Sequence, residues 1–385
     1  MMRTLQKIDP DLSALLLLTM RLVWRMWFEK KNPKQMREAP VPMMDWMLLK
    51  CIYTSTPTLK PEDNPFSELE EKVKTTFKEL TGSECEWLIQ AEWNDIFGRI
   101  LGCAHAVTDI TSLPLGEQCL GRALFMKHSF FNHACAPNAF LSMQPGDATV
   151  TAQVRMLRPL QPKEAVTISY IPLSGMDKQE RQARLLSGYH FTCACESCTG
   201  DKFEDLVKVP DGADVNALRV VQFTCNETLV RLEQAVDATN TTTTPEKEEL
   251  ENCIATLEMS KKGIGNQNIP GSHEIVIESH RLLAKAYSLQ GKSAEAIQEH
   301  QAFFQAVEPI DPIFDPVSKA TQRLALAKDY KTLEKQDDYL AQLKLASEGA
   351  TVALGAEHAF IKGIAEELGS DEAPPSKKQK VEDSS

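Results

Sequence analysis

The sequence predicts an α+β protein in which a strand-rich segment lies between two helical regions. Residues 102–172 have short segments punctuated by Gly and Pro, whereas residues 213–367 look helical throughout. Three cysteines follow the strand-rich segment within residues 193–198. Cysteines clustered this tightly rarely form disulfides and often bind a metal, so the sequence also predicts a metal-stabilised loop.

The composition is that of a globular protein, with 42% hydrophobic and 25% charged residues. A net charge of −12 argues against general nucleic-acid binding, which needs a basic face. The apolar stretch from Leu12 to Phe28 contains Arg21 and Arg25, whereas a membrane-spanning helix needs about 20 apolar residues with few charges. We therefore expect a packed amphipathic helix there, no membrane span and no direct nucleic-acid partner.

Several elements can be placed from periodicity and turn chemistry. Helices are expected over residues 11–30 and over residues 66–101, where apolar side chains recur every three or four residues. Two strands, 139–143 and 148–156, flank a Gln-Pro-Gly-Asp turn, and a third is expected at 165–171. A helix should follow from Asp177, with Glu180 completing a capping box, and should end near Gly188.

The C-terminal half is expected to be helical. Residues 280–306 resemble a tetratricopeptide unit, with small residues where paired helices approach closely, and residues 322–355 repeat the pattern more weakly. An unspecific helical bundle is the alternative. Residues 368–385 are expected to be a disordered tail, in which residues 375–381 resemble a short basic nuclear-import signal. The expected location is the nucleus, the cytoplasm or both.

A metal site is expected at the C-x-C-x2-C motif of Cys193, Cys195 and Cys198. The motif supplies three soft ligands, whereas zinc takes four in a tetrahedron. Cys135 is the best fourth candidate because it lies in a polar loop that contains Pro137. The residue types leave three rivals open: His133, His190 and Cys225.

The order of three motifs resembles that of the SET-domain protein-lysine methyltransferases. Residues 132–138 read N-H-x-C-x-P-N, residues 164–170 form a strand ending in Tyr, and residues 193–198 match the post-SET zinc motif. The helix running into Tyr-x-Phe-x-Cys-x-Cys and the helical C-terminal region resemble the SET-and-MYND subgroup in particular. The resemblance covers residues 66–365 and implies a SET-type β-fold with a knot-like crossing.

The resemblance assigns roles to individual residues. Asn132 and His133 would bind the cofactor S-adenosylmethionine, together with Tyr170, and Phe191 would stack on its adenine. Tyr170 would be the catalytic residue, where the methyl donor meets the substrate lysine. Tyr189 would line the lysine channel. One structural zinc ion would be held by four residues: Cys135, Cys193, Cys195 and Cys198.

The resemblance also implies a division of the chain. Its parts would be a helical segment inserted in or preceding the core (1–101), the SET core (102–175), the post-SET helix and zinc loop (176–205), a tetratricopeptide-like domain (213–367) and the tail (368–385). The substrate would be a lysine of a protein or peptide, histone or otherwise, and the C-terminal domain would bind peptide partners.

The sequence departs from the family pattern in its N-terminal part. The Gly-rich turn of the first SET strand and the zinc-binding MYND module are not seen, and no Gly precedes Gly82. We therefore expect a shortened form or a protein that has lost half of its cofactor pocket. Ala104 stands where family members often have a cofactor-contacting Asn, and Lys163 replaces a turn Gly. A catalytically inactive scaffold is the alternative function, and a zinc-stabilised helical adaptor without strands is a third.

Overall fold

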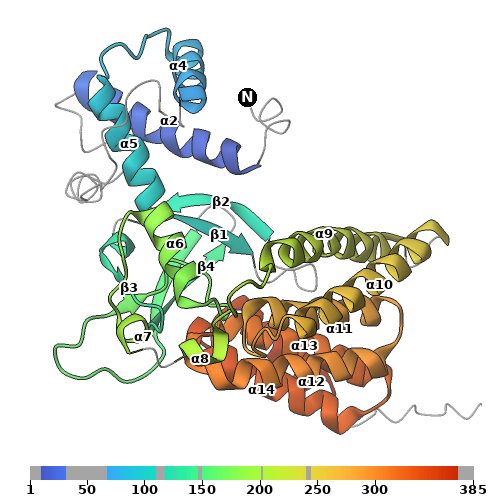
Figure 1. The fold of residues 1–385 in the computed structure, drawn as a ribbon. Helices are drawn as coiled ribbons and strands as arrows, with labels where there is room; N and C mark the ends of the chain where they lie inside the picture. The colour runs from blue at the N-terminus through green and yellow to red at the C-terminus, as the bar shows by residue number, and fades with distance from the viewer. Residues whose placement is uncertain are drawn as a thin grey trace, which may run out of the picture.

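The computed structural model describes residues 10–31, 67–109, 118–125, 127–145, 150–200, 203–239 and 244–371. These residues form three tiers, which Figure 1 shows from top to bottom. Helices make up the N-terminal tier, short strands the middle tier, and a stack of helices the C-terminal tier. Among the described helices, none combines the length and the apolar character needed to cross a bilayer.

Within residues 10–31 and 67–103, which the structure describes, three helices form the N-terminal tier: α2 (Pro10–Lys31), α4 (Ser67–Thr81) and α5 (Gln90–Cys103). The expected helix at 11–30 is confirmed, and its buried Val23 packs in one apolar cluster with Phe77 and Trp93. The single helix expected at 66–101 is wrong, because the chain breaks after α4. Gly82 closes α4 through its N–H on the Lys78 carbonyl and adopts a φ of +67°, which redirects the chain.

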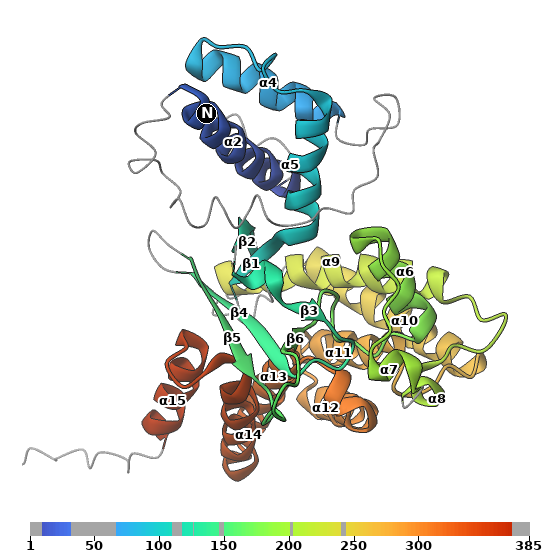
Figure 2. The ribbon, with the colours of Figure 1, turned by 90° about the vertical axis from the view of Figure 1, so that its left-hand side faces the viewer.

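The middle tier contains three two-stranded sheets. In the described residues β1 (Ala104–Asp109) pairs with β2 (Gln118–Leu124), β3 (Asn132–His133) with β6 (Thr167–Ile168), and β4 (Ala139–Pro145) with β5 (Val150–Met156). The predicted hairpin is therefore confirmed as β4–β5, which packs against α14 (Gln336–Leu354) in Figure 2. This strand-rich core excludes the strand-free helical adaptor.

The strand expected at 165–171 is shorter than predicted. Only two of its residues form a ladder, parallel to β3. The side chain of Asn138 forms hydrogen bonds with the backbone of this segment. Its amide nitrogen donates to the Ala165 carbonyl at 2.8 Å, and its amide oxygen accepts from the Thr167 N–H at 2.8 Å. A buried side chain thus replaces the strand partner that this segment lacks.

Glu164 closes the turn before β6. Its carboxylate accepts from the Gln161 N–H at 2.9 Å and from the Asn138 amide at 3.1 Å, and it pairs with Arg158. The Arg158 guanidinium, helped by these hydrogen bonds, lowers the Glu164 pKa to about 2. The carboxylate therefore stays ionised and fixes the turn that leads into the strand before Tyr170.

Lys163, the residue that replaces a turn Gly, has a φ of +71°. A left-handed backbone costs a residue with a Cβ roughly 1–2 kcal/mol, and the greater chain entropy of Gly offsets roughly 0.5–1 kcal/mol of that. Lys163→Gly is therefore expected to raise the free energy of unfolding by about 0.5–1 kcal/mol in urea titration. Gln161→Gly, in the same turn without positive φ, should lower it, and a loss in both variants would contradict this account.

The C-terminal tier consists of helices, as expected for residues 213–367. In the described residues they are α9 (Val215–Thr239), α10 (Thr244–Asn266), α11 (Glu274–Leu289), α12 (Ser293–Val307), α13 (Pro316–Thr332), α14 and α15 (Ala359–Asp371), with the 3-10 segment η4 (Glu308–Ile313). The two predicted repeat units fall on the pairs α11–α12 and α13–α14. The disordered tail was expected from residue 368, but α15 runs to Asp371, so residues 368–371 are helical. Residues 375–381 lie outside the described residues.

Helices α11, α13 and α15 begin in the same way. The preceding residue caps each helix: His273 Nδ1 accepts from the Ile275 N–H at 3.2 Å, and His358 Nδ1 accepts likewise from Phe360 at 3.2 Å. Asp315 does the same through its carboxylate. The three caps recur at intervals of roughly 42 residues. This regular spacing indicates an internal repeat of helix pairs in the C-terminal tier.

The segment 171–176, directly after Tyr170, docks on the C-terminal tier through its backbone. The Leu173 carbonyl accepts from the Asp315 N–H at 3.0 Å, and the Gly175 carbonyl accepts from the Glu274 N–H at 3.1 Å. Gly175 has a φ of +83°, and a Cβ there would lie 2.6 Å from the Ser272 carbonyl oxygen. Only glycine fits this close approach.

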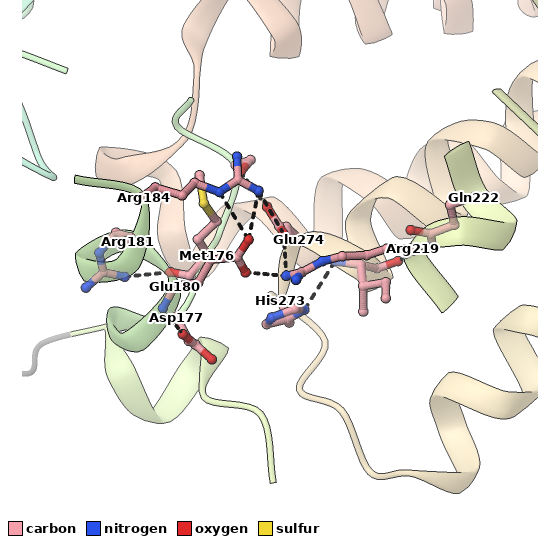
Figure 3. A network of polar contacts seen from close by, with 11 residues as sticks. Met176, Asp177, Glu180, Arg181, Arg184, Arg219, Gln222, His273 and Glu274 are labelled. Atoms are coloured by element: carbon pink, nitrogen blue, oxygen red, sulfur yellow. Dashed lines mark hydrogen bonds and ion pairs between the residues drawn. The ribbon is translucent and has the colours of Figure 1, made fainter. Parts of the chain in front are cut away.

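A polar network adds to this contact (Figure 3). Arg219 of α9 pairs with Glu180 of the middle tier and with Glu274 of α11, at 2.7 Å for the latter. Arg184 contacts Glu180 at 2.7 Å, and the Ser174 hydroxyl donates to Glu274 at 2.8 Å. Because the carboxylates are largely buried, this network fixes the middle tier on the C-terminal tier.

Candidate active site and four-cysteine centre

Helix α6 (Lys178–Tyr189) leads the chain into the cysteine motif. Its N-cap Asp177 accepts from the Glu180 N–H at 2.8 Å, as predicted. The reciprocal half of the predicted capping box is not formed, because the Glu180 carboxylate is engaged by Arg184 and Arg219. His190 ends the helix with a φ of +59°, so the chain turns back toward the middle tier.

Four cysteines come together at this turn: Cys135, Cys193, Cys195 and Cys198. Their Sγ atoms lie within 4.8 Å of one another, and all but Cys195 are buried. Sulfur atoms bound to zinc at about 2.3 Å stand roughly 3.8 Å apart in a regular tetrahedron. Small shifts of the loop would therefore close a four-thiolate metal site.

The rivals for the fourth ligand lie elsewhere. His190 is exposed at the end of α6, and Cys225 packs in α9 beside Cys253 within a separate apolar cluster. His133 approaches the Cys135 Sγ with its Nε2 at 3.4 Å, but its Nδ1 accepts from the Tyr170 N–H at 3.0 Å. The structure thus places His133 between the cysteines and Tyr170 and gives Cys135 the fourth corner.

Gln182 holds the cysteine loop, and sequence reasoning missed it. Its amide donates to the Cys193 carbonyl at 2.7 Å and accepts from the Cys193 N–H at 2.8 Å. A glutamine eleven residues before a cysteine carries no recognisable sequence signal. Its role follows only from the turn at His190, which brings the loop back along α6.

The predicted catalytic and substrate-channel tyrosines lie together. Tyr170 follows β6, Tyr189 ends α6, and their ring centroids are 4.9 Å apart. The Tyr189 hydroxyl donates to the Tyr170 carbonyl at 3.0 Å. Phe191 stands edge-on to Tyr170 at 6.3 Å, and the His133 ring lies 5.4 Å from the Tyr170 ring. Four predicted site residues therefore share one aromatic cluster.

Tyr170 is held so that its hydroxyl is a fixed, protonated group. The hydroxyl donates to the Phe131 carbonyl at 2.5 Å, and burial raises its pKa to about 12. Burial also lowers the His133 pKa to about 4, so that its ring is neutral and can accept the Tyr170 N–H. Because the Tyr170 hydroxyl donates its hydrogen to the Phe131 carbonyl, the lone pairs of its oxygen can accept a hydrogen bond from a ligand.

Asn132, the remaining predicted cofactor residue, lies on β3 with its side chain exposed. Its backbone pairs with Thr167, which places it beside His133 at the start of the four-cysteine loop. The structure does not bring its side chain into the aromatic cluster. An exposed side chain at this edge remains available to a ligand from outside the chain.

Comparison with known proteins shows what the chain is similar to. A family profile of the SET domain matches residues 28–171. Human N-lysine methyltransferase SMYD2 is 26% identical over 253 residues, covering 65% of this chain and 55% of the relative. A SET and MYND domain-containing protein of Dictyostelium discoideum is 37% identical over 81 residues, covering 21% of this chain and 22% of the relative.

A third relative is histone-lysine N-methyltransferase ATXR2 of Arabidopsis thaliana, 41% identical over 83 residues, which cover 22% of this chain and 17% of the relative. The chain thus spans from under a fifth to just over half the length of these relatives. The profile match covers the middle tier as far as Ile171, including β3, β6 and Tyr170. Residues 28–171 therefore match the SET domain, and the chain is similar to the SET-and-MYND lysine methyltransferases.

Proposed function

We propose that this chain transfers a methyl group from S-adenosylmethionine to the side-chain amine of a lysine in a protein. The observation that carries the proposal is the meeting of Tyr170, Tyr189, Phe191 and His133 next to the four cysteines. His133 lies on β3, Tyr170 follows β6, and Tyr189 and Phe191 lie at and just after the end of α6. The fold of the middle tier brings these separate segments together. Their residue types suit methyl transfer without a strong base.

The chemistry requires a neutral amine, whereas free lysine has a pKa of about 10.4. Partly buried aromatic rings such as Tyr170 and Tyr189 exclude water from an ammonium, which lowers its pKa. The rings also attract a cationic amine by cation–π interaction. The cofactor, when bound, supplies an electrophilic methyl group on a positive sulfonium. The Tyr170 oxygen would orient the amine toward that methyl group.

The four-cysteine centre is proposed to hold one structural zinc ion. Four protein thiolates leave no open position, which is typical of structural sites. The centre would fasten the loop from His190 to Cys198, and with it Phe191, beside β3. The nucleus and cytoplasm are the proposed locations, because reducing conditions there keep thiols available for a metal.

Two finer fold assignments belong to the same proposal. The parallel pair β3–β6 would be the place of the knot-like crossing, since it joins residues 132–133 to residues 167–168. The capped helices of the C-terminal tier would form tetratricopeptide-like repeats that bind peptide partners. A non-catalytic scaffold is the second candidate. It is favoured by Ala104, at the start of β1, which offers no polar group to a cofactor.

Calorimetric titration of S-adenosylmethionine into the zinc-loaded chain separates these functions. Saturable binding that Asn132→Ala weakens supports the enzyme, and a lysine-peptide assay then follows. A folded, zinc-loaded chain that binds no cofactor supports the scaffold.

Tyr170→Phe tests the catalytic assignment. The variant keeps the ring packing but loses the hydroxyl oxygen, so the expected result is a fall of roughly 10²–10³-fold in kcat with cofactor affinity within about threefold of wild type. Methyl transfer to a lysine peptide is measured under single-turnover conditions. Tyr330→Phe, in α13, is the matched control and should keep full activity. Equal rates for both variants would exclude Tyr170 as the catalytic residue.

A further inference from the structure

Arg181 is a buried cation whose charge is poorly matched by carboxylates. Its side chain on α6 is 7% exposed, and its Nη1 donates to the Met176 carbonyl at 2.5 Å. Its ion pair with Glu204 is 4.0 Å long, and the Glu204 carboxylate already accepts from the Lys178 N–H at 3.1 Å. Buried charges in proteins are normally paired, so Arg181 requires a further negative group.

The four cysteines supply that group. Arg181 and Cys135 line the same cavity, of about 10 Å³, together with Met176. Burial opposes the charge of Arg181, but the neighbouring Cys135 and Cys198 raise the pKa of its guanidinium above the ordinary value. In Figure 3, a dashed line joins Arg181 to the Met176 carbonyl, whereas Arg184 reaches the Glu180 carboxylate. The two arginines of α6 therefore have different partners: Arg181 lies beside the four-cysteine centre, and Arg184 pairs with Glu180.

The charge of the centre explains why a cation belongs there. Four thiolates around a divalent zinc ion carry a net charge of about −2, and burying such a charge is costly unless it is compensated. Two backbone N–H groups contribute, from Cys135 to the Cys195 Sγ and from Cys195 to the Cys193 Sγ, both at 3.4 Å. These are dipoles, and Arg181 adds a full positive charge on the side of Cys135 and Cys198.

We propose that Arg181 compensates the charge of the four-cysteine centre and thereby raises its affinity for zinc. The proposal rests on the zinc centre proposed above. Arg181 also holds the Met176 carbonyl, at the end of the segment that docks on the C-terminal tier. One guanidinium thus lies beside Cys135 of the four-cysteine centre and donates to the segment that follows Tyr170.

The test compares zinc affinity of the full chain and its variants by competition with a chromogenic chelator under reducing conditions. Arg181→Gln keeps the size but removes the charge, and its affinity is expected to fall about 10–100-fold, as for other residues that support metal ligands. Arg184→Gln, one turn later on α6 and 43% exposed in its side chain, is the matched control and should stay within about twofold. Cobalt(II) binding, followed by thiolate-to-metal absorption, should show the same order.

Glu204→Gln tests the proposal even if Arg181→Gln folds poorly. It removes the competing carboxylate, so zinc affinity should stay unchanged or rise, and a tenfold fall would overturn the proposal. If Arg181→Gln folds, wild-type zinc affinity in that variant would overturn the proposal too. A wild-type chain that takes up no zinc would instead disprove the four-cysteine centre itself, so the two failures are distinguishable.

Discussion

Cys135→Ser is expected to abolish stoichiometric zinc binding, with a loss of affinity well above the roughly 100-fold seen when a supporting residue is removed. Cys135 is 1% exposed and joins β3 to a loop some 60 residues later in the chain. A closed structural site with one thiolate missing loses both a bond and the constraint on that long loop. The loop from His190 to Cys198 should then become sensitive to protease.

The measurement is zinc per chain after gel filtration, with protease cleavage in the loop followed by mass spectrometry. Cys225→Ser is the matched control, because Cys225 is also a buried thiol but lies in α9 away from the centre. It should retain one zinc ion per chain. Loss of zinc in Cys225→Ser but not in Cys135→Ser would reverse the ligand assignment.

Gly175→Ala is expected to lower the free energy of unfolding by about 1.5–4 kcal/mol. The left-handed backbone, less the chain entropy of Gly, costs a Cβ-bearing residue roughly 0.5–1 kcal/mol, and overpacking adds roughly 1–3 kcal/mol. The new Cβ would lie 2.6 Å from the Ser272 carbonyl oxygen and 2.9 Å from the Ile310 Cδ1. Neither the backbone of Ser272 nor the fully buried Ile310 can move without disturbing the contact between the tiers.

Gly212→Ala isolates the contribution of the backbone. Gly212 has a φ of +86° but nothing within 4 Å of a Cβ, so this variant should lose only about 0.5–1 kcal/mol, the left-handed cost less the chain entropy of Gly. Urea and thermal unfolding of both variants give the comparison. Equal losses would show that the close approach at Gly175 does not matter to stability.

The features predicted correctly are those that short-range chemistry decides. The Gln-Pro-Gly-Asp pattern predicts the β4–β5 hairpin, and the cap at Asp177 fixes the start of α6. The C-x-C-x2-C motif brings three thiols together within one loop. Each of these features depends on residues that are neighbours in the chain, so the sequence alone is sufficient to predict it.

Features that depend on groups far apart in sequence needed the fold. Cys135 is the best fourth candidate in the sequence, and the parallel pairing of β3 with β6 then places it beside Cys195. The third strand is short because Asn138 bonds its backbone from 27 and 29 residues away. Arg219 takes Glu180 away from its predicted capping box across 39 residues. Such partners leave no periodic signal, so only the fold reveals them.

The backbone bonds of segment 171–176 have a consequence for biosynthesis. Leu173 and Gly175 are held by the N–H groups of Asp315 and Glu274, which the ribosome adds about 100–140 residues later. At roughly 5–20 residues per second, the support of the segment after Tyr170 arrives roughly 5–28 seconds after the segment itself. A nascent chain of this protein therefore carries an unsupported segment at the candidate active site until Asp315 has been translated.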